Sequence, residues 1–318
     1  MIRVFVNLIR LPVTLVLILV VALLRSCGAK ISLRWLLSQC GPSFVKFGQT
    51  LSVRPDIVGP EYAAELAGLR DDMKQFSSVQ ARKIIEKELG RSVQSCFKQF
   101  EDIPVAAASV AQVHKAKTHD GKQVAVKILR PNVARDFALD MMLFYWVAYF
   151  FSLFRTNKRL RLVEVVDTFA ATVRKELDLR MEAAAASKLA SNLKSDKDVR
   201  VPTIFWSFTS QRVMTSSWVD GVPIHHTEAL EKAGHNCKVL AKRMYLNFLN
   251  QAYRDGFFHA DIHPGNVLVQ QDGTIAVVDF GIMGILSDET KFFVAEILRG
   301  FLISDYDYVA KVHFDAGY

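Results

Sequence analysis

Three side chains at fixed spacing constrain this sequence more than any other feature. Asp261 and Asn266 lie five residues apart within His-Ala-Asp-Ile-His-Pro-Gly-Asn, and Asp279 begins Asp-Phe-Gly thirteen residues after Asn266. A short strand pattern around an Asp-Gly turn separates the two motifs. A carboxylate beside an attacking oxygen, with amide and carboxylate oxygens of the kind that Mg²⁺ prefers, is the set of groups that phosphoryl transfer needs. Each residue alone would suit a turn or a strand end, but the joint spacing predicts one shared site.

A lysine on a predicted strand extends this pattern toward the N-terminus. Protein kinases carry H-R-D-x-x-x-x-N, D-F-G and, earlier in the chain, a V-A-I-K strand whose lysine contacts the nucleotide phosphates. Here Lys127 ends Val-Ala-Val-Lys within the expected strand Gln123–Leu129 and precedes the other motifs in the same order. An ammonium on a buried strand needs an acidic partner, and Glu182, in the expected helical stretch Glu176–Leu193, is the candidate. We therefore predict Asp261, Lys127 and Glu182 as catalytic residues and Asn266 and Asp279 as metal ligands.

The segment expected to cover the phosphates departs from the kinase pattern. Kinases use G-x-G-x-x-G between their first two strands, whereas this sequence contains no Gly-x-Gly anywhere. The residues at that position are Ala106, Ala107, Ala108 and Ser109. Alanine keeps such a loop small but excludes most positive-φ conformations. We therefore expect the phosphates to be held differently from those in a glycine-rich cradle.

Charge is distributed unevenly along the chain. The net charge is +8, but residues 1–55 hold seven basic side chains and no acidic one, so the remaining residues are almost neutral. A neutral body without a basic stripe argues against a nucleic-acid reader. A basic, apolar arm suits an anionic membrane surface instead. The four cysteines form no C-x-x-C or zinc pattern and are expected to be reduced thiols.

The N-terminal arm contains an unbroken apolar run of 14 residues, Leu11–Leu24. As a helix this run spans about 21 Å, short of a ~30 Å hydrocarbon core. Extension back to Val4 gives about 31 Å but includes Asn7 and Arg10. A membrane anchor, a signal peptide and an apolar helix packed on the body are the three interpretations, and no convincing cleavage site favours the second. We expect a membrane-associating segment, with a transmembrane helix if the longer run spans the bilayer.

Further motifs make a family resemblance specific. Lys46-Phe47-Gly48-Gln49 reads K-x-G-Q, residues 106–109 form an alanine-rich loop, and Glu176-Leu177-Asp178 reads E-x-D. With these motifs, residues 31–318 resemble the UbiB family of atypical, kinase-like proteins, which is linked to ubiquinone biosynthesis and often labelled 2-polyprenylphenol 6-hydroxylase. The resemblance implies that the K-x-G-Q helix lies over the active site, and Gly48 within it suggests a close backbone approach. The cofactor-binding residues that it implies are Lys46, Gln49, Glu176, Asp178, Lys127, Ala106, Ala107, Ala108 and Ser109.

The order of elements predicts an α+β, bilobal, protein-kinase-like fold with an N-terminal helical extension and an N-terminal apolar helix. Four segments are expected: 1–30, a membrane-associating segment; 31–100, the helical extension carrying K-x-G-Q; 101–220, a small lobe of sheet and inserted helices; and 221–318, a large helical lobe cut short after its catalytic and metal loops. Breaks in the extension are expected at Gly41-Pro42, Arg54-Pro55 and Gly59-Pro60.

Patterning locates several elements inside these segments. Strands are expected at Val105–Val113, Val201–Phe208 and Arg212–Trp218, besides the strand that ends near Lys127. One long helical stretch is expected from about Arg135 through Leu193. Its apolar part, residues 141–153, is expected to be a buried helix, with a lipid-facing or partner-facing surface as the alternative.

The resemblance implies an ATP-binding protein that uses ATP and Mg²⁺ as an ATPase or kinase and supports ubiquinone (coenzyme Q) biosynthesis. Because the extension would block docking of a protein substrate, ATPase activity coupled to a membrane lipid or polyprenyl quinone precursor is favoured. The expected partners are this lipid and other ubiquinone-biosynthesis proteins. The expected location is the cytoplasmic face of the bacterial inner membrane or the matrix face of the mitochondrial inner membrane.

Three other functions are compatible with parts of the sequence. A nucleotide-binding scaffold for a lipid-biosynthesis complex would bind ATP without turnover. A small-molecule phosphotransferase of the aminoglycoside-kinase type shares H-x-D-x-x-x-x-N but has no need of the K-x-G-Q segment. A flavin hydroxylase, the activity in the old family label, should carry a dinucleotide fingerprint after a strand, and the sequence has none.

Overall fold

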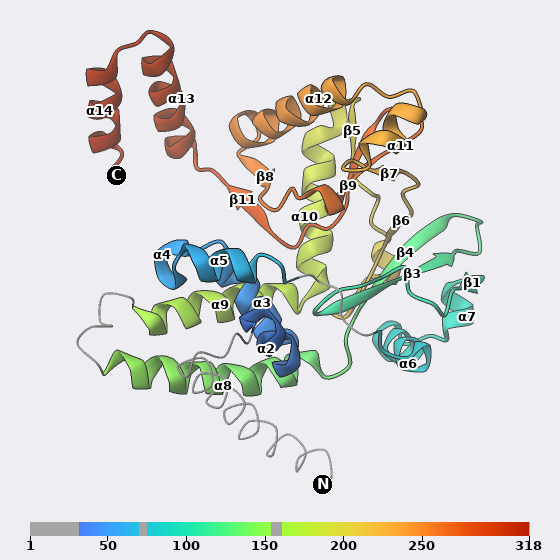
Figure 1. Ribbon diagram of the computed structural model, residues 1–318. Coiled ribbons are helices and arrows are strands. Elements are labelled where there is room, and N and C mark those ends of the chain that lie inside the picture. Colours follow the sequence, from blue (N-terminus) through green and yellow to red (C-terminus); the bar gives the residue numbers. More distant parts are fainter. Residues whose placement is uncertain (1–31, 70–74, 154–160, 318) are drawn as a thin grey trace. The chain divides into compact units, whose positions relative to one another are not determined.

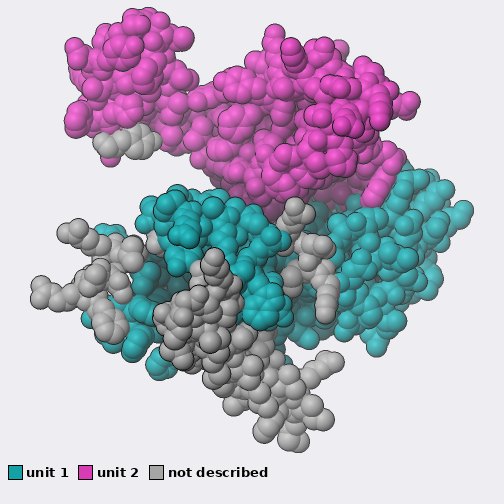
Figure 2. Space-filling view, in the orientation of Figure 1, with its two compact units in different colours: residues 1–179, 206–215 teal, residues 180–205, 216–318 magenta. Residues whose placement is uncertain are grey.

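The computed structural model describes residues 32–69, 75–153 and 161–317 and divides the chain into two compact units (Figure 1, Figure 2). Unit 1 comprises residues 1–179 and 206–215, and unit 2 comprises residues 180–205 and 216–318. These boundaries differ from the predicted ones, because the helix that carries Glu182 belongs to the C-terminal unit. The reason is packing: Ala186 and Leu189 on that helix are fully buried in the core of unit 2.

Unit 1 is built on a five-stranded sheet of order β1-β3-β4-β6, with β2 paired to β3. The strands are β1 (Gln99–Phe100), β2 (Ala106–Ala107), β3 (Ala111–Lys117), β4 (Gln123–Leu129) and β6 (Val213–Ser217). Strand β4 alternates as predicted, because Val124, Val126 and Ile128 are fully buried on one face. The single strand expected at Val105–Val113 is divided, because the chain turns after β2 and returns as the start of β3, so that the two strands form an antiparallel hairpin.

Most of the described helices of unit 1 begin at a proline or directly after a serine whose side chain caps the first turn. They are α2 (Leu33–Cys40), α3 (Pro42–Ser52), α4 (Pro55–Val58), α5 (Pro60–Leu66), α6 (Ser78–Leu89), α7 (Val93–Cys96), α8 (Val133–Ser152) and α9 (Leu162–Glu176). Three of them start at a proline, which confirms the breaks predicted from the sequence, because proline suits the first turn of a helix, where its missing N–H has no partner. The single helical stretch expected up to Leu193 is wrong: α8, α9 and α10 (Leu179–Asn192) are separate helices.

Helix α3 lies against the hairpin formed by α8 and α9 (Figure 1). An aromatic cluster holds it there. The ring of Phe47 stacks on Phe144 at 4.7 Å between centroids and meets Phe169 edge-on at 5.1 Å. Ser43 at the start of α3 also hydrogen-bonds the buried carboxylate of Asp140. The prediction that residues 141–153 form a buried helix is correct for one face only, since the opposite face exposes several large side chains, among them Trp146.

Unit 2 contains a four-stranded sheet, β5-β10-β9-β7, and a two-stranded sheet, β11-β8. The strands are β5 (Val199–Arg200), β7 (Val222–Pro223), β8 (Phe257–His259), β9 (Val267–Val269), β10 (Ile275–Val277) and β11 (Met283–Ile285). The helices are α10, α11 (Thr227–Lys232), α12 (Cys237–Leu249), α13 (Asp288–Leu302) and α14 (Tyr306–Asp315). The predicted hairpin between the two motifs is confirmed as β9 and β10. The strand predicted at Val201–Phe208 is reduced to a single antiparallel bridge between Ile204 and Ser216, because Trp206–Phe208 forms a 3₁₀ turn.

Within residues 32–69, 75–153 and 161–317, no helix combines the length and the apolar character needed to cross a membrane. The apolar run Leu11–Leu24, on which the prediction of a membrane-associating or transmembrane segment rests, lies outside the described residues.

Candidate active site

A buried histidine connects the two acidic motifs of unit 2. His259, at the end of β8, is 1% exposed. The backbone N–H of Asp261 donates to His259 Nδ1 at 3.1 Å, so the ring proton lies on Nε2, which donates to the carbonyl oxygen of Asp279. Burial lowers the pKa of His259, which favours the neutral ring that this arrangement requires. One imidazole therefore fixes the backbone positions of both carboxylate-bearing segments.

The loop after β8 brings Asp261 and Asn266 together. Asn266 Nδ2 donates to the Asp261 carbonyl at 3.4 Å, and the Asn266 backbone N–H donates to the backbone carbonyl of His263 at 2.9 Å. The Asn266 carbonyl in turn accepts the N–H of Val278, one residue before Asp279, at 2.8 Å. Hydrogen bonds to backbone groups thus link the segments that carry Asp261, Asn266 and Asp279 within unit 2.

Asp279 adopts a backbone conformation that side chains other than glycine seldom take. Its φ is +68°, in the left-handed region, where aspartate is among the tolerated residues. Its Oδ1 accepts the N–H of Gly281 at 3.1 Å, which closes a tight turn. Non-glycine residues held in this region cluster at functional sites. The next residue, Phe280, is buried in the core of unit 2 and so anchors the turn from inside.

A π-helical turn holds the start of the loop that follows β8, through a hydrogen bond to His259. The segment η4 (Asn250–Arg254) follows α12 and places the amide of Gln251 in the interior, where it is fully buried. Gln251 Oε1 accepts the backbone N–H of His259 at 3.0 Å, and its Nε2 donates to Asn247. π-turns within helices frequently occur near functional sites.

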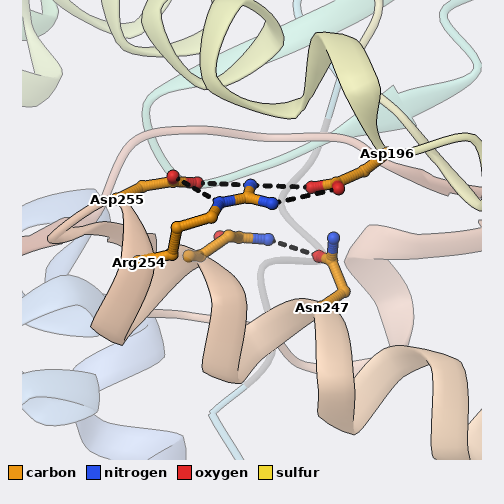
Figure 3. Close-up of polar contacts among 5 residues, drawn as sticks. Asp196, Asn247, Arg254 and Asp255 are labelled. Atoms are coloured by element: carbon orange, nitrogen blue, oxygen red, sulfur yellow. Dashed lines mark hydrogen bonds and ion pairs between the residues drawn. The ribbon is translucent and has the colours of Figure 1, made fainter.

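The same turn carries an arginine that links two acidic side chains (Figure 3). Arg254 donates to both carboxylate oxygens of Asp196, at 3.1 and 2.8 Å, and to both oxygens of Asp255, at 2.7 and 2.9 Å. Bidentate pairs of this kind hold geometry better than single contacts. Arg254 thereby ties the π-turn to the segment after α10, and the sequence offered no signal for this role.

Glu182 lies on α10 beside the Asp-Phe-Gly motif. It is 8% exposed, and its Oε1 accepts the backbone N–H of Phe280 at 3.4 Å. Lys127 lies on β4 of unit 1, opposite Val113 of β3, and is half-buried. The predicted pairing of Lys127 with Glu182 stays a prediction.

In unit 1, the K-x-G-Q helix α3 is joined to the end of α9. Lys46 Nζ lies 2.9 Å from Glu176 Oε1, and their side chains are 18% and 7% exposed. The pair joins one residue of the K-x-G-Q motif to one residue of the E-x-D motif. Asp178 lies in the short link between α9 and α10, where its N–H donates to the Lys175 carbonyl at 3.2 Å. Gln49 Nε2 donates to the carbonyl of Leu69 at 3.4 Å.

Gly48 is required by close packing. A Cβ at this position would lie 2.4 Å from Leu69 Cδ1 and 2.7 Å from Leu37 Cδ1. The close approach suggested by the sequence is therefore confirmed, and it is an approach of leucine side chains to the helix backbone.

The alanine-rich loop is a short, closed hairpin end. Ala107 pairs with Gln112, and the N–H of Ala108 donates to the carbonyl of Ala111 at 2.8 Å, so two residues remain outside the ladder. No residue from 105 to 111, all within the described part of the chain, has a positive φ. The sequence argument about alanine is thus confirmed for the backbone.

The donors in unit 2 fit Mg²⁺ chemically. Because Asn266 Nδ2 is held by the Asp261 carbonyl, its amide oxygen is directed away from that contact. Asp279 is exposed to solvent and supplies carboxylate oxygen. Hard oxygen donors from one or two side chains are what Mg²⁺ takes in phosphoryl-transfer sites. Among the described residues, no group of three or more His, Cys, Asp or Glu is arranged to hold a metal ion.

Unit 2 has a buried histidine that bridges an Asp-x-x-x-x-Asn loop and an Asp-Phe-Gly turn, and unit 1 has a five-stranded sheet that carries Lys127. Together these features define a kinase-like protein. The chain belongs to the family described as the ABC1 atypical kinase-like domain, whose sequence model matches residues 68–313. It is 42% identical over 291 residues, 90% of this chain, to a Marinobacter nauticus protein named "Probable protein kinase UbiB". These matches confirm the resemblance to the UbiB family.

The chain spans about half the length of this curated relative, since the match covers 53% of it. A solved structure with a similar fold is that of Rv3197 from Mycobacterium tuberculosis in complex with erythromycin. Its TM-score is 0.58 at 25% sequence identity, and the match covers 94% of this chain and 75% of the Rv3197 chain.

Proposed function

We propose that this chain binds ATP with Mg²⁺ and transfers the γ-phosphoryl group to water or to a small acceptor, in support of ubiquinone biosynthesis at a membrane. The observation that carries the proposal is the hydrogen-bonded joining of Asp261, Asn266 and Asp279 around His259. The name of the curated relative supports the pathway, and the basic, apolar N-terminal arm supports the membrane.

Each side chain has a role that its chemistry allows. Asp261 orients the attacking oxygen and accepts its proton, while the bond from that oxygen to the γ-phosphorus forms and the bond to the bridging oxygen of ADP breaks. Asn266 and Asp279 would hold Mg²⁺, which neutralises phosphate charge when bound. Lys127 supplies an ammonium for the phosphates, with Glu182 as its proposed partner.

The family resemblance also assigns nucleotide-binding residues to unit 1. Ala106, Ala107, Ala108 and Ser109 form the loop at the position where kinases cover the phosphates. Lys46 and Gln49, with the E-x-D carboxylates, are proposed to contribute from the helical extension. The Lys46–Glu176 ion pair supports this assignment, because it fixes the K-x-G-Q and E-x-D motifs side by side.

Phosphate release from Mg-ATP by the purified chain, with and without vesicles, tests the proposal. Wild type is expected to turn over, Asp261→Asn to lower kcat by about 100-fold or more, and Asp279→Asn to abolish turnover. Asp272→Asn is the matched control, because Asp272 lies on the exposed turn between β9 and β10. Its Oδ1 accepts the N–H of Thr274, and the amide oxygen of asparagine can do the same.

The other outcomes identify the alternatives. ATP binding without release of phosphate by wild type would indicate a scaffold. Phosphorylation of a soluble hydroxyl compound would indicate a small-molecule phosphotransferase, and erythromycin belongs in that assay because it accompanies Rv3197. Bound flavin in the purified protein would revive the hydroxylase.

A further inference from the structure

A pocket of about 640 Å³ lies within unit 2, apart from the candidate active site. It is lined by the end of α10, the segment that follows α10, residues 217–219 and the end of β9. Residues 257–266 and 279–281, which carry the acidic motifs, are not part of its described lining. Small-molecule sites typically have volumes of about 300–1,000 Å³. The pocket is therefore large enough for a metabolite, and no motif in the sequence accounts for it.

Part of the pocket wall carries positive charge that no described carboxylate balances. Lys194 and Lys197 line the pocket, both are exposed, and neither has an ion-pair partner among the described residues. Asp196 also lines it, but its two oxygens accept hydrogen bonds from Arg254 at 3.1 and 2.8 Å (Figure 3). Arg200, the third basic side chain of the lining, has a carboxylate partner at 3.3 Å. The two lysines therefore leave the pocket with an excess of positive charge.

Another part of the wall is apolar and held in place. It includes Val199, which belongs to the core of unit 2, and the indole of Trp218. Trp218 Nε1 donates to Asp220 Oδ1 at 2.7 Å, which restrains the plane of the ring. Beside it, the Thr203 N–H donates to Ser217 Oγ at 2.9 Å and the Ser217 N–H donates to the Thr203 carbonyl at 2.8 Å. An indole restrained in this way is a surface on which a flat apolar group can stack.

We propose that this pocket binds a small organic anion with a flat, apolar body, and that its occupancy orders the loop that carries Asp261. Lys194 and Lys197 bind the anionic group through charge-assisted hydrogen bonds, and Trp218 contacts the apolar body. Binding in the pocket is independent of the proposed function. The effect on the loop rests on that function, because it concerns how the same active site is regulated.

Arg254 connects the pocket to the active-site loop. It binds Asp196 at the pocket wall and belongs to the π-turn η4, whose Gln251 accepts the N–H of His259 at 3.0 Å. His259 Nδ1 in turn accepts the N–H of Asp261 at 3.1 Å. A ligand held by the lysines that flank Asp196 restrains this segment, and the bidentate pair passes the restraint on to η4. Asp196 and Arg254 are positioning residues in this account.

Binding is tested with 1-anilinonaphthalene-8-sulfonate, a flat anion, and with N-phenyl-1-naphthylamine, which has the same rings without the sulfonate. Fluorescence titration of the full chain without nucleotide gives both dissociation constants. The test variant combines Lys194→Glu with Lys197→Glu. The control combines Lys238→Glu with Lys242→Glu, an equal change of charge at two exposed lysines of α12 that do not line the pocket. Both variants keep the exposed apolar faces elsewhere on the chain, so their difference reports the pocket.

The dissociation constant of the sulfonate is expected to rise about tenfold or more in the test variant, because two attractive charges become repulsive. It should stay within about twofold of wild type in the control, and the uncharged probe should bind all three proteins alike. Trp218→Leu should weaken the binding of both probes. The melting temperature of each variant checks its folding. Equal sulfonate binding by the test variant and the control overturns the proposal.

Hydrogen exchange without nucleotide tests the connection to the loop. In wild type, the sulfonate should slow exchange in peptides that cover residues 255–266 by about threefold or more. Asp196→Ala removes the pair with Arg254 and should abolish this slowing while the probe still binds. Asp198→Ala is the control, because Asp198 pairs with Arg243 at 3.6 Å and does not line the pocket. This variant should keep the slowing.

The outcomes separate this proposal from the proposed function. Slowing that is absent in wild type, or that persists in Asp196→Ala, overturns the connection between the pocket and the loop. Neither experiment contains ATP, so lack of ATP turnover by the purified chain contradicts the proposed function alone. Normal turnover together with equal sulfonate binding by the two double variants contradicts the pocket alone.

Discussion

His259 and Asp279 lie 20 residues apart in sequence, yet the imidazole Nε2 of the first donates to the backbone carbonyl of the second. The other ring nitrogen accepts the N–H of Asp261. The histidine of the His-x-Asp motif is therefore a buried connector that holds the acidic turn and the preceding loop in register. It also makes the stability of unit 2 dependent on pH.

Burial lowers the pKa of His259 below its ordinary value of 6.5. The unfolded chain therefore takes up a proton at higher pH than the folded chain does. The contribution to stability is fully present above about pH 6.5 and is lost as the pH falls from there toward the folded-state pKa. We expect the free energy of unfolding by urea to fall more steeply between pH 7.5 and 5.5 in wild type than in His259→Phe.

His114 contributes in the same direction, because burial lowers its pKa as well. The comparison therefore keeps His114 in both proteins, so that their difference reports His259 alone. Identical pH dependence in the two proteins would show that protonation of His259 is not linked to unfolding.

The ion pair between Lys46 and Glu176 should contribute measurably to stability. Glu176→Gln leaves the partly buried ammonium without its carboxylate, and we expect the free energy of unfolding to fall by about 2 kcal/mol. The control is Asp56→Asn, which removes the partner of Arg54 from an exposed pair and should leave the free energy unchanged within error. Equal effects of the two variants in urea titrations would refute the argument from burial.

Gly48→Ala should destabilise unit 1 despite the higher helix propensity of alanine. The added methyl group meets Leu69 Cδ1 at 2.4 Å, and overpacking of this kind costs about 1–3 kcal/mol, against a gain of about 1 kcal/mol from propensity. The double variant with Leu69→Ala should lose less stability than the sum of the single variants, because the clash is removed. Additive losses in thermal unfolding would argue that the methyl group is accommodated elsewhere.

Glycine in the alanine-rich loop should alter nucleotide binding. Ala107→Gly and Ala108→Gly admit positive φ at a tip that now has none. We expect the dissociation constants for ATP and ADP to change by different factors, about fivefold or more for one of them. Ala233→Gly, at the end of α11 in unit 2, is the control. Unchanged constants for both loop variants would remove the loop from the account of binding.

Deletion of residues 1–25 should move the chain from the membrane pellet to the supernatant. The reason is chemical: this segment carries the Leu11–Leu24 run, flanked by arginine on both sides. Sedimentation with vesicles that contain anionic phospholipid measures the effect, and vesicles of neutral phospholipid test the electrostatic part. Equal sedimentation of the full and shortened chains would assign membrane binding to another surface.

The sequence could predict the elements whose signals are local. Helices begin at Pro42, Pro55 and Pro60, β4 alternates around Val126, and the hairpin between the two acidic motifs follows an Asp-Gly turn. These features depend on neighbours in the chain. Proline fixes its own φ, and every second side chain of a strand is buried on the same face of the sheet. The strand expected at Val201–Phe208 is reduced to one bridge, between Ile204 and Ser216, because Trp206–Phe208 turns into a short 3₁₀ helix that the apolar pattern did not indicate.

By itself, the sequence determined which chemical groups are present and in what order: Lys127, the Asp261–Asn266 loop and the Asp279 turn. Only the tertiary structure decided what holds them. Phe280 meets Glu182 98 residues away, Arg130 reaches back 22 residues to Ala108, and Gln112 pairs with Phe76 across 36. A buried polar group must find a partner wherever packing places one, and because that partner is chosen by the fold and not by the neighbouring residues, no local pattern announces it.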